Sequence, residues 1–217
     1  MSAGEPESPV NSETTNQDRE ETMSDELDTY AELFALLSRC FETPEEAFID
    51  AVRSGTFENE LKSRLEALDV TVESMPSVEE TTSFREAYRQ TFESYEGPYA
   101  APYESVYKEW HDGTKRGILS GPPAHDMERR YEALDADIPD AYPPDHLALL
   151  LEYASLLCEA GNQDAFEQFH DDHFDWIPEF HERVEQTCEE PFYRWAVDVL
   201  ARVLEQFEHP PETTNTE

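Results

Sequence analysis

The sequence predicts an all-α protein: a single helical domain of about eight or nine helices between two acidic tails. Three observations support this fold class. Apolar residues recur at three- and four-residue spacing through most of the chain, as they do on one face of an α-helix. Helix-starting and helix-stopping signals flank these segments. Val and Ile together number only 14 of the 217 residues, which leaves little material for a β-sheet.

Both ends of the chain are predicted to be disordered. Residues 1–23 consist mainly of Ser, Thr, Glu, Pro, Asn and Gln, with almost no apolar side chain beyond Val10. Residues 209–217 have the same character. Such segments cannot bury enough apolar surface to offset the entropy lost on ordering. The helical domain is therefore expected to span residues 24–208.

Capping signals predict two helices before residue 56. Ser24 or Asp25 can cap a helix whose apolar residues continue to residue 41. Thr43 then precedes a Pro and two Glu, the pattern of a capping box with Pro at the first helical position. Gly55 is expected to end this second helix, because glycine readily adopts the left-handed conformation of a C-cap.

The middle of the chain holds two further helix candidates. A second capping box at residues 77–80 precedes an apolar repeat over 84–95, which the Gly-Pro pair at 97–98 ends. Residues 122–134 form the other candidate, with Pro at the start. The short alternation Val-Thr-Val at 70–72 is the one strand-like piece.

The most apolar helix is predicted in the second half. Asp145 opens it as an N-cap, and Gly161 closes it as a left-handed C-cap. Its apolar residues cover more than one stripe, so this helix is expected to be central and buried. Three amphipathic helices complete the domain, over residues 164–173, 178–188 and 191–207.

The charge of the chain excludes several classes of function. Asp and Glu number 51 against 15 Lys and Arg, a formal net charge of -36 at pH 7, which rules out a basic nucleic-acid-binding face. The longest apolar run, residues 147–151, is far shorter than the roughly 20 residues needed to cross a bilayer. The N-terminus is acidic and lacks a signal pattern. We expect a cytoplasmic protein without stable membrane insertion.

The composition also indicates in which solvent the protein stays soluble. Most acidic residues lie inside the expected domain, so the folded surface itself must be acidic, and only three of the 15 basic residues are Lys. This composition is typical of halophilic proteins that stay soluble in concentrated salt. In molar salt the Debye length falls to about 3 Å, so the charges of such a surface attract or repel a partner only at very short range. A partner must be held by close contacts.

No cofactor or catalytic centre is predicted. The chain lacks a phosphate-binding glycine loop, a nucleophile elbow and a zincin motif. Its three cysteines, Cys40, Cys158 and Cys188, are widely spaced without a Cys-x-x-Cys pair. They are therefore expected to be ordinary buried thiols in a reducing compartment.

One metal-binding alternative stays open. Glu167-x-x-His170 has the spacing of half a carboxylate-bridged di-iron site, and His173 adds a second imidazole to the same helix face. A di-iron bundle needs a second Glu-x-x-His, which the chain lacks. A helical metalloenzyme that uses these three residues is the alternative from a different class of protein.

Two irregular stretches carry the most information about function. The first gathers Tyr99, Tyr103, Tyr107 and Trp110 around Pro102, which bars a helix from starting earlier. One reading is that these rings fill the gap between two helices. The other is that they line a groove for an extended peptide, because aromatic side chains give a large contact area at low entropic cost.

The second stretch, residues 142–147, lies at the start of the most apolar helix. Asp145 is explained as its N-cap. His146 beside it can hydrogen-bond the backbone of a ligand or hold two halves of the domain together at a hinge near residues 139–146, and a purely structural role is equally open.

These motifs together resemble those of the TorD/DmsD/NarJ-type redox enzyme maturation chaperones. Residues 102–107 read Pro-Tyr-Glu-Ser-Val-Tyr, and some forty residues later Pro-x-Asp-His precedes a long apolar helix. A Phe-x-x-x-His-x-x-Trp-x-Pro-x-Phe segment at 169–180 agrees, so the resemblance covers roughly residues 27–207. Tyr142 is a departure, since the family usually has Glu before the first Pro of the Asp-His motif.

The resemblance implies a cytosolic all-α chaperone that is not an enzyme. Its partner would be the precursor of a molybdopterin-containing oxidoreductase, held by its twin-arginine leader until the cofactor is inserted. A NarJ-like subtype, which assembles a nitrate-reductase-type complex without reading a leader, is the close alternative. The oligomeric state would be a monomer or a homodimer. A structural interaction protein, whose aromatic stretch is only core packing, is a further alternative.

The same resemblance suggests where the peptide binds. Asp145 and His146 fall on the Asp-His motif of the family. Because a twin-arginine leader offers two guanidiniums and an apolar core, Glu104, Asp145 and Glu152 are candidate partners for Arg, and Tyr103 and Tyr107 are expected to pack on the apolar region. The full set of predicted peptide-binding residues is Tyr99, Pro102, Tyr103, Glu104, Ser105, Tyr107, Trp110, Pro144, Asp145, His146, Leu149 and Glu152.

Overall fold

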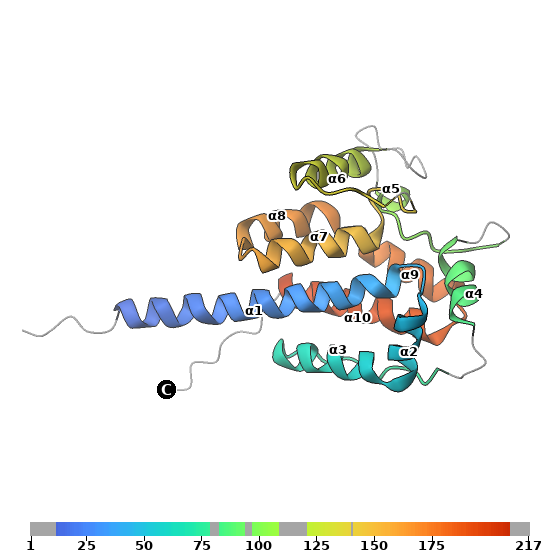
Figure 1. The fold of residues 1–217 in the computed structure, drawn as a ribbon, viewed down its shortest axis with the longest axis horizontal. Helices are drawn as coiled ribbons and strands as arrows, with labels where there is room; N and C mark the ends of the chain where they lie inside the picture. The colour runs from blue at the N-terminus through green and yellow to red at the C-terminus, as the bar shows by residue number, and fades with distance from the viewer. Residues whose placement is uncertain (1–11, 79–82, 94–96, 109–120, 140, 209–217) are drawn as a thin grey trace, which may run out of the picture.

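The protein is all-α, as predicted (Figure 1). The computed structural model describes side chains from residue 23 onward and the backbone over residues 12–78, 83–93, 97–108, 121–139 and 141–208. Ten α-helices and one π-helix make up this part of the chain, and it contains no strand. The strand-like alternation at 70–72 forms no strand or bridge in the described chain.

The long helix α1 (Ser12–Phe41) organises the domain. It packs against α7 (Leu147–Glu159), α3 (Thr56–Ala67) and α10 (Pro191–Glu208). The sequence predicted a start at Ser24 or Asp25, whereas the helix already begins at Ser12, inside the segment expected to be disordered. The limits of the domain at residues 24 and 208 stay a prediction.

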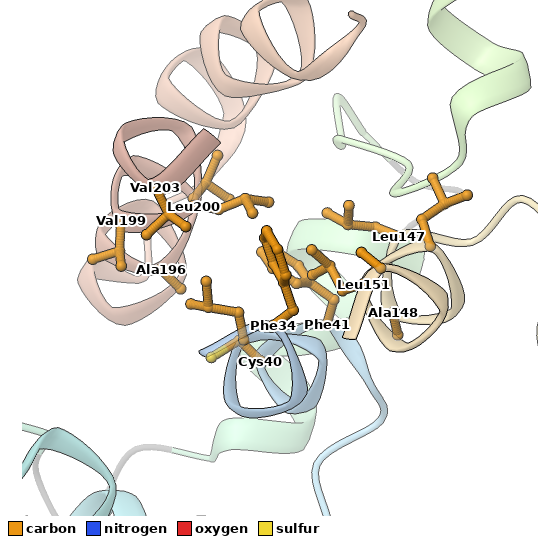
Figure 2. Packing of buried hydrophobic residues seen from close by; sticks show 14 of the residues in the cluster. Phe34, Cys40, Phe41, Leu147, Ala148, Leu151, Ala196, Val199, Leu200 and Val203 are labelled. Carbon is orange, nitrogen blue, oxygen red and sulfur yellow. The ribbon is translucent and has the colours of Figure 1, made fainter. Parts of the chain in front are cut away.

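The core forms where α1, α7 and α10 meet. Figure 2 shows Phe34 and Phe41 of α1 lying between Leu147 and Leu151 of α7 and Leu200 of α10. All five side chains are fully buried. Burial of a side chain of this size contributes roughly 1.5–3 kcal/mol. The prediction of a central, buried helix after residue 145 is therefore confirmed.

Two short helices follow α1, and only one of them was predicted. α2 (Glu46–Ser54) begins after Glu45, later than the capping box at Thr43 predicts, and ends as expected at Gly55 with φ 76°. α3 starts directly afterwards at Thr56. Its buried stripe is narrow, with Phe57, Leu61 and Leu65 recurring every four residues among polar side chains, which is why the sequence pattern was missed.

The next helix leads into the aromatic stretch. α4 (Phe84–Tyr88) is capped by Ser83, whose hydroxyl accepts a hydrogen bond from the N–H of Glu86, so residue 77 does not cap this helix. Residues 79 and 80 of the predicted capping box lie outside the described residues. The chain continues as a π-helix, η1 (Arg89–Glu93). The Thr91 carbonyl accepts a hydrogen bond from the N–H of Ala100 at 2.8 Å, which fixes where the aromatic stretch begins.

The remaining helices mostly follow their sequence signals. They are α5 (Glu104–Tyr107), α6 (Pro122–Ala133), α8 (Gln163–His173) and α9 (Ile177–Thr187). All except the short α5 begin within one residue of the predicted position. The three cysteines are buried free thiols, as expected. None of the helices in the described ranges combines the length and apolar character that a bilayer-spanning segment needs.

Candidate functional site

The two stretches that the sequence analysis singled out lie against each other in the fold. Residues 102–105 pair with residues 145–147, and we call this contact the seam. The N–H of Leu147 donates to the Pro102 carbonyl at 2.9 Å, and the N–H of Glu104 donates to the Asp145 carbonyl at 3.2 Å. Tyr103 and His146 form an isolated antiparallel bridge between these bonds. Some forty residues of chain separate the two sides.

Asp145 does not cap the helix that follows it. Its carboxylate accepts a hydrogen bond from the N–H of Ser105 at 2.8 Å, so it caps the short helix α5 across the seam. The N-cap of α7 is His146, whose Nδ1 accepts from the N–H of Ala148 at 3.1 Å. The prediction that Asp145 opens the apolar helix is therefore wrong by one residue, because its side chain is engaged by another element.

His146 is enclosed by aromatic rings. Its imidazole lies 4.3 Å from the ring centre of Tyr142 and 5.3 Å from that of Tyr103, and only 1% of the residue is exposed. Burial lowers the pKa of His146 to about 3, since the apolar surroundings disfavour the charged imidazolium. The ring is therefore neutral and serves as a hydrogen-bond acceptor.

Two polar atoms at the seam lack a partner. The hydroxyl oxygen of Ser105 and Oδ1 of Asp145 are buried, and neither makes a hydrogen bond within the described part of the chain. Both residues are 0% exposed. Buried polar atoms almost always have partners, so an unpaired one calls for an explanation such as a ligand or an ordered water. These two oxygens can therefore accept hydrogen bonds from a ligand or an ordered water that reaches the seam.

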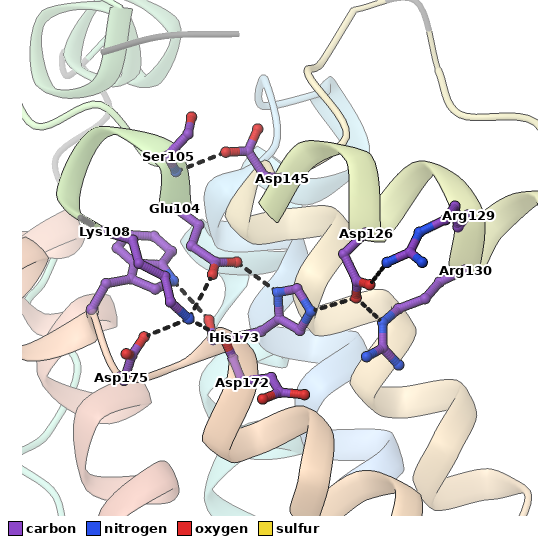
Figure 3. Close-up of polar contacts among 11 residues, drawn as sticks. Glu104, Ser105, Lys108, Asp126, Arg129, Arg130, Asp145, Asp172, His173 and Asp175 are labelled. Atoms are coloured by element: carbon purple, nitrogen blue, oxygen red, sulfur yellow. Dashed lines mark hydrogen bonds and ion pairs between the residues drawn. The ribbon is translucent and has the colours of Figure 1, made fainter. Parts of the chain in front are cut away.

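A charged network lies beneath α5 (Figure 3). Nδ1 of His173 lies 2.7 Å from the Glu104 carboxylate, and Nε2 lies 3.0 Å from that of Asp126. Lys108 approaches Glu104 to 3.2 Å, and Arg130 binds Asp126 at 2.5 Å. The network joins α5, α6 and α8 through a single imidazole.

Burial and pairing oppose each other in this network. Burial raises the pKa of Glu104, although its bonds with His173 and Lys108 act in the opposite direction. Burial would also raise the pKa of Asp126, but hydrogen bonds from Arg130 and His173 outweigh it and lower that pKa. Each carboxylate is thus held by a basic partner as well as by His173.

A surface pocket of about 460 Å³ adjoins the aromatic stretch. Tyr99 and Tyr107 line one side, and α9 supplies the other with Glu179 and Glu182. The Tyr107 ring stacks on Trp176 at 5.2 Å between ring centres, so this tyrosine is part of the core as well as of the pocket wall. Sequence reasoning did not identify the α9 wall, because its acids are not distinguishable from the many others.

The structure brings most of the predicted peptide-binding residues together, but not all of them. Pro102 is buried and Pro144 is half-buried on the two sides of the seam. Leu149 is buried in the core, and Glu152 is exposed further along α7. Trp110 lies outside the described residues. Lys108, Asp126 and Arg130 were not predicted, since only the fold brings their helices together.

The residues of the metal-binding alternative do not converge. Glu167 and His170 line a cavity of about 620 Å³ between α1, α8 and α10, whereas His173 is engaged by Glu104 and Asp126. Within the described ranges, no three His, Cys, Asp or Glu side chains are placed to hold one metal ion. The geometry therefore gives no support to a metalloenzyme built on these three residues.

Comparison with models of known families identifies one family. Residues 54–182, more than half of the chain, match the family model described as nitrate reductase delta subunit. Among solved structures, the chain is similar to a protein from Archaeoglobus fulgidus provisionally assigned to redox enzyme maturation. The TM-score is 0.48 at 21% sequence identity, over 83% of this chain and 93% of that chain. No curated protein matches the sequence significantly.

Proposed function

Because the chain belongs to the nitrate reductase delta subunit family, the NarJ/TorD group of non-catalytic redox enzyme maturation chaperones, we propose that it binds a peptide segment of an immature molybdoenzyme at the seam. The client is held in the cytoplasm until its molybdopterin cofactor is inserted. The bound segment is the twin-arginine leader, and the chaperone itself needs no cofactor.

The unpartnered oxygens of Ser105 and Asp145 are the observation that carries this proposal. A peptide backbone or a guanidinium offers N–H donors, which both oxygens can accept. An unsatisfied buried acceptor costs about 1–3 kcal/mol, so a ligand that satisfies it recovers part of this free energy. The neighbouring backbone of residues 102–104 already pairs in an extended arrangement, which suits an extended peptide.

The adjoining pocket supports binding of the rest of a leader. Tyr99 and Tyr107 offer aromatic surface to apolar leader residues. Of the acids predicted to bind Arg, Glu104 is engaged by His173 and Lys108 inside the protein. The exposed carboxylate of Glu182 stands at the pocket wall beside Arg183, so we propose Glu182 as the nearest site for a guanidinium.

Titration of the protein with a synthetic leader peptide tests this function. The variant Ser105→Ala removes a buried hydroxyl that has no partner within the described part of the chain, so the free energy of unfolding should be unchanged or slightly higher. Leader affinity should fall about threefold to tenfold, the value of one hydrogen bond. Ser38→Ala is the matched control, because the Ser38 hydroxyl is also buried but donates to Ala35 in α1. Equal affinity in the two variants would contradict the proposal.

The family description favours a second candidate client. It names nitrate reductase, so the chaperone would then assemble a nitrate-reductase-type complex without reading a leader. Affinity capture of the tagged protein at native salt, followed by mass spectrometry, should recover a molybdoenzyme subunit in either case. Deletion of the leader from that subunit separates the two: capture is lost if the leader is read and persists if another segment is bound.

A further inference from the structure

We propose that His173 is a latch that holds the seam closed, and that release of this latch limits peptide binding. The inference rests on the peptide-binding function proposed above and adds a regulatory step to the same site. It arises from a side chain of helix α8 that contacts both α5 and α6 from beneath (Figure 3).

Each nitrogen of the His173 ring contacts a carboxylate. Nδ1 faces Glu104 at 2.7 Å and Nε2 faces Asp126 at 3.0 Å. Each ring nitrogen therefore lies within hydrogen-bonding distance of a carboxylate on a different helix. The ring is 3% exposed, and its other close neighbour is the Phe169 ring of its own helix, at 4.6 Å between centres. One imidazole therefore ties both helices to α8.

Lys108 reinforces the latch from the other end of α5. Its ammonium lies 3.2 Å from Glu104 and 3.2 Å from Asp175, and it also donates to the Asp172 carbonyl. Arg130 in turn holds Asp126 in place. The four residues of α5 are thus bound at both ends to the corner between α8 and α9, although such a short helix is unstable on its own.

The latch opposes peptide binding, because both depend on the position of α5. Ser105 and the Asp145 carboxylate face each other across the closed seam, and both are 0% exposed. A peptide reaches their unpartnered oxygens only if α5 moves away from Asp145, and that movement pulls Glu104 away from His173. The observed affinity is then reduced by the fraction of molecules in which the seam is open. Weakening the latch should therefore tighten peptide binding.

Two measurements on the full chain test the latch. The first is amide hydrogen exchange of residues 99–108, and the second is titration with the leader peptide. Glutamine carries both of its N–H donors on a single nitrogen, so in His173→Gln it cannot face the two carboxylates from opposite sides as the two ring nitrogens do. We expect exchange of residues 99–108 to accelerate at least about tenfold and leader affinity to increase by a similar factor.

The matched control is His170→Gln on the same helix. His170 is also buried, at 5% exposure, but it contacts Phe166, Phe174 and Phe207 and neither α5 nor α6. General weakening of α8 would accelerate exchange in both variants and would not tighten binding. Glu104→Gln, which keeps the shape of the side chain and removes its charge, gives a second route if His173→Gln does not fold.

The outcomes separate the latch from the function on which it rests. Unchanged exchange at residues 99–108 in the folded variant, or faster exchange with weaker leader binding, overturns the latch. Faster exchange in His173→Gln alone, with no leader binding by either protein, supports the latch as a mechanical element and overturns peptide binding at the seam.

Discussion

At the scale of single residues, Asp145 and His146 stabilise two different helices. The Asp145 carboxylate binds the N–H of Ser105 in α5, and the His146 imidazole binds the N–H of Ala148 in α7. Each side chain satisfies an N–H group that its helix cannot satisfy internally. The pair therefore fixes the starts of two helices that meet at the seam.

Replacing Asp145 should lower the free energy of unfolding, because α5 loses the carboxylate that caps it. Asp145→Ala removes the acceptor for Ser105 and is expected to lower the free energy of unfolding by about 1–2 kcal/mol. Asp145→Asn keeps an acceptor oxygen and should recover part of that loss. Urea unfolding measures the difference, with Asp171→Ala as a control because the Asp171 side chain is 84% exposed. Equal losses for Asp145→Ala and the control would show that the cap contributes nothing.

His146 should make stability depend on pH in the acidic range. Burial lowers its pKa from 6.5 to about 3 in the folded state, so protons bind the unfolded chain more tightly. Stability is then highest above pH 6.5 and falls as the pH drops toward 3. The expected loss from His146 is about 2 kcal/mol between about pH 7 and about pH 5.

The variant His146→Asn isolates this contribution. Asparagine is a good N-cap that does not titrate, so the variant should lose about 2 kcal/mol less than the wild type between about pH 7 and about pH 5. Urea unfolding at both pH values gives the comparison. Other groups titrate equally in both proteins, so identical pH dependence would contradict a neutral, buried His146.

At the scale of elements, α5 and α7 are stabilised in opposite ways, α5 by contacts with other elements and α7 by its own hydrophobic content. α5 has four residues and is held by Asp145, which precedes α7, and by contacts from α8 and α6. α7 has eight buried residues in its thirteen, and its hydrophobic content alone drives it into the core. The sequence pattern accordingly predicted α7 well and gave no helix at residues 104–107.

Two leucines of α7 should differ widely in their contribution to stability. Leu150 is fully buried, whereas Leu156 is 44% exposed. Leu150→Ala should cost about 2–5 kcal/mol, because it removes packed methyl groups and leaves a cavity. Leu156→Ala, an identical change in the same helix, should cost less than about 1 kcal/mol. Similar costs in thermal or urea unfolding would contradict the burial of α7 in the core.

At the scale of the whole molecule, net charge dominates the interaction with solvent. The chain carries a formal charge of -36 at pH 7, and self-repulsion on this scale opposes the compact state. The ion pairs found are mostly on the surface, such as Lys62 with Glu66 and Arg202 with Asp198, and pairs of this kind contribute little. The burial of apolar side chains must therefore outweigh the repulsion.

Added salt should stabilise this protein. Raising the salt from about 0.1 M to about 1 M shortens the Debye length from about 10 Å to about 3 Å and screens the repulsion between carboxylates. The urea midpoint at neutral pH should therefore rise steadily with potassium chloride. A midpoint that stays constant or falls over this range would show that the acidic surface does not limit stability.

The sequence by itself determined the helical fold class, the buried helix after residue 145 and the two stretches that meet at the seam. These features depend on local properties, namely the spacing of apolar residues, the helix end at Gly55 and the arrangement of motifs along the chain. Only the tertiary structure decided that Asp145 caps α5 and that His173 lies between Glu104 and Asp126. Such contacts depend on which helix faces oppose each other, and that follows from packing of the whole core rather than from any one segment.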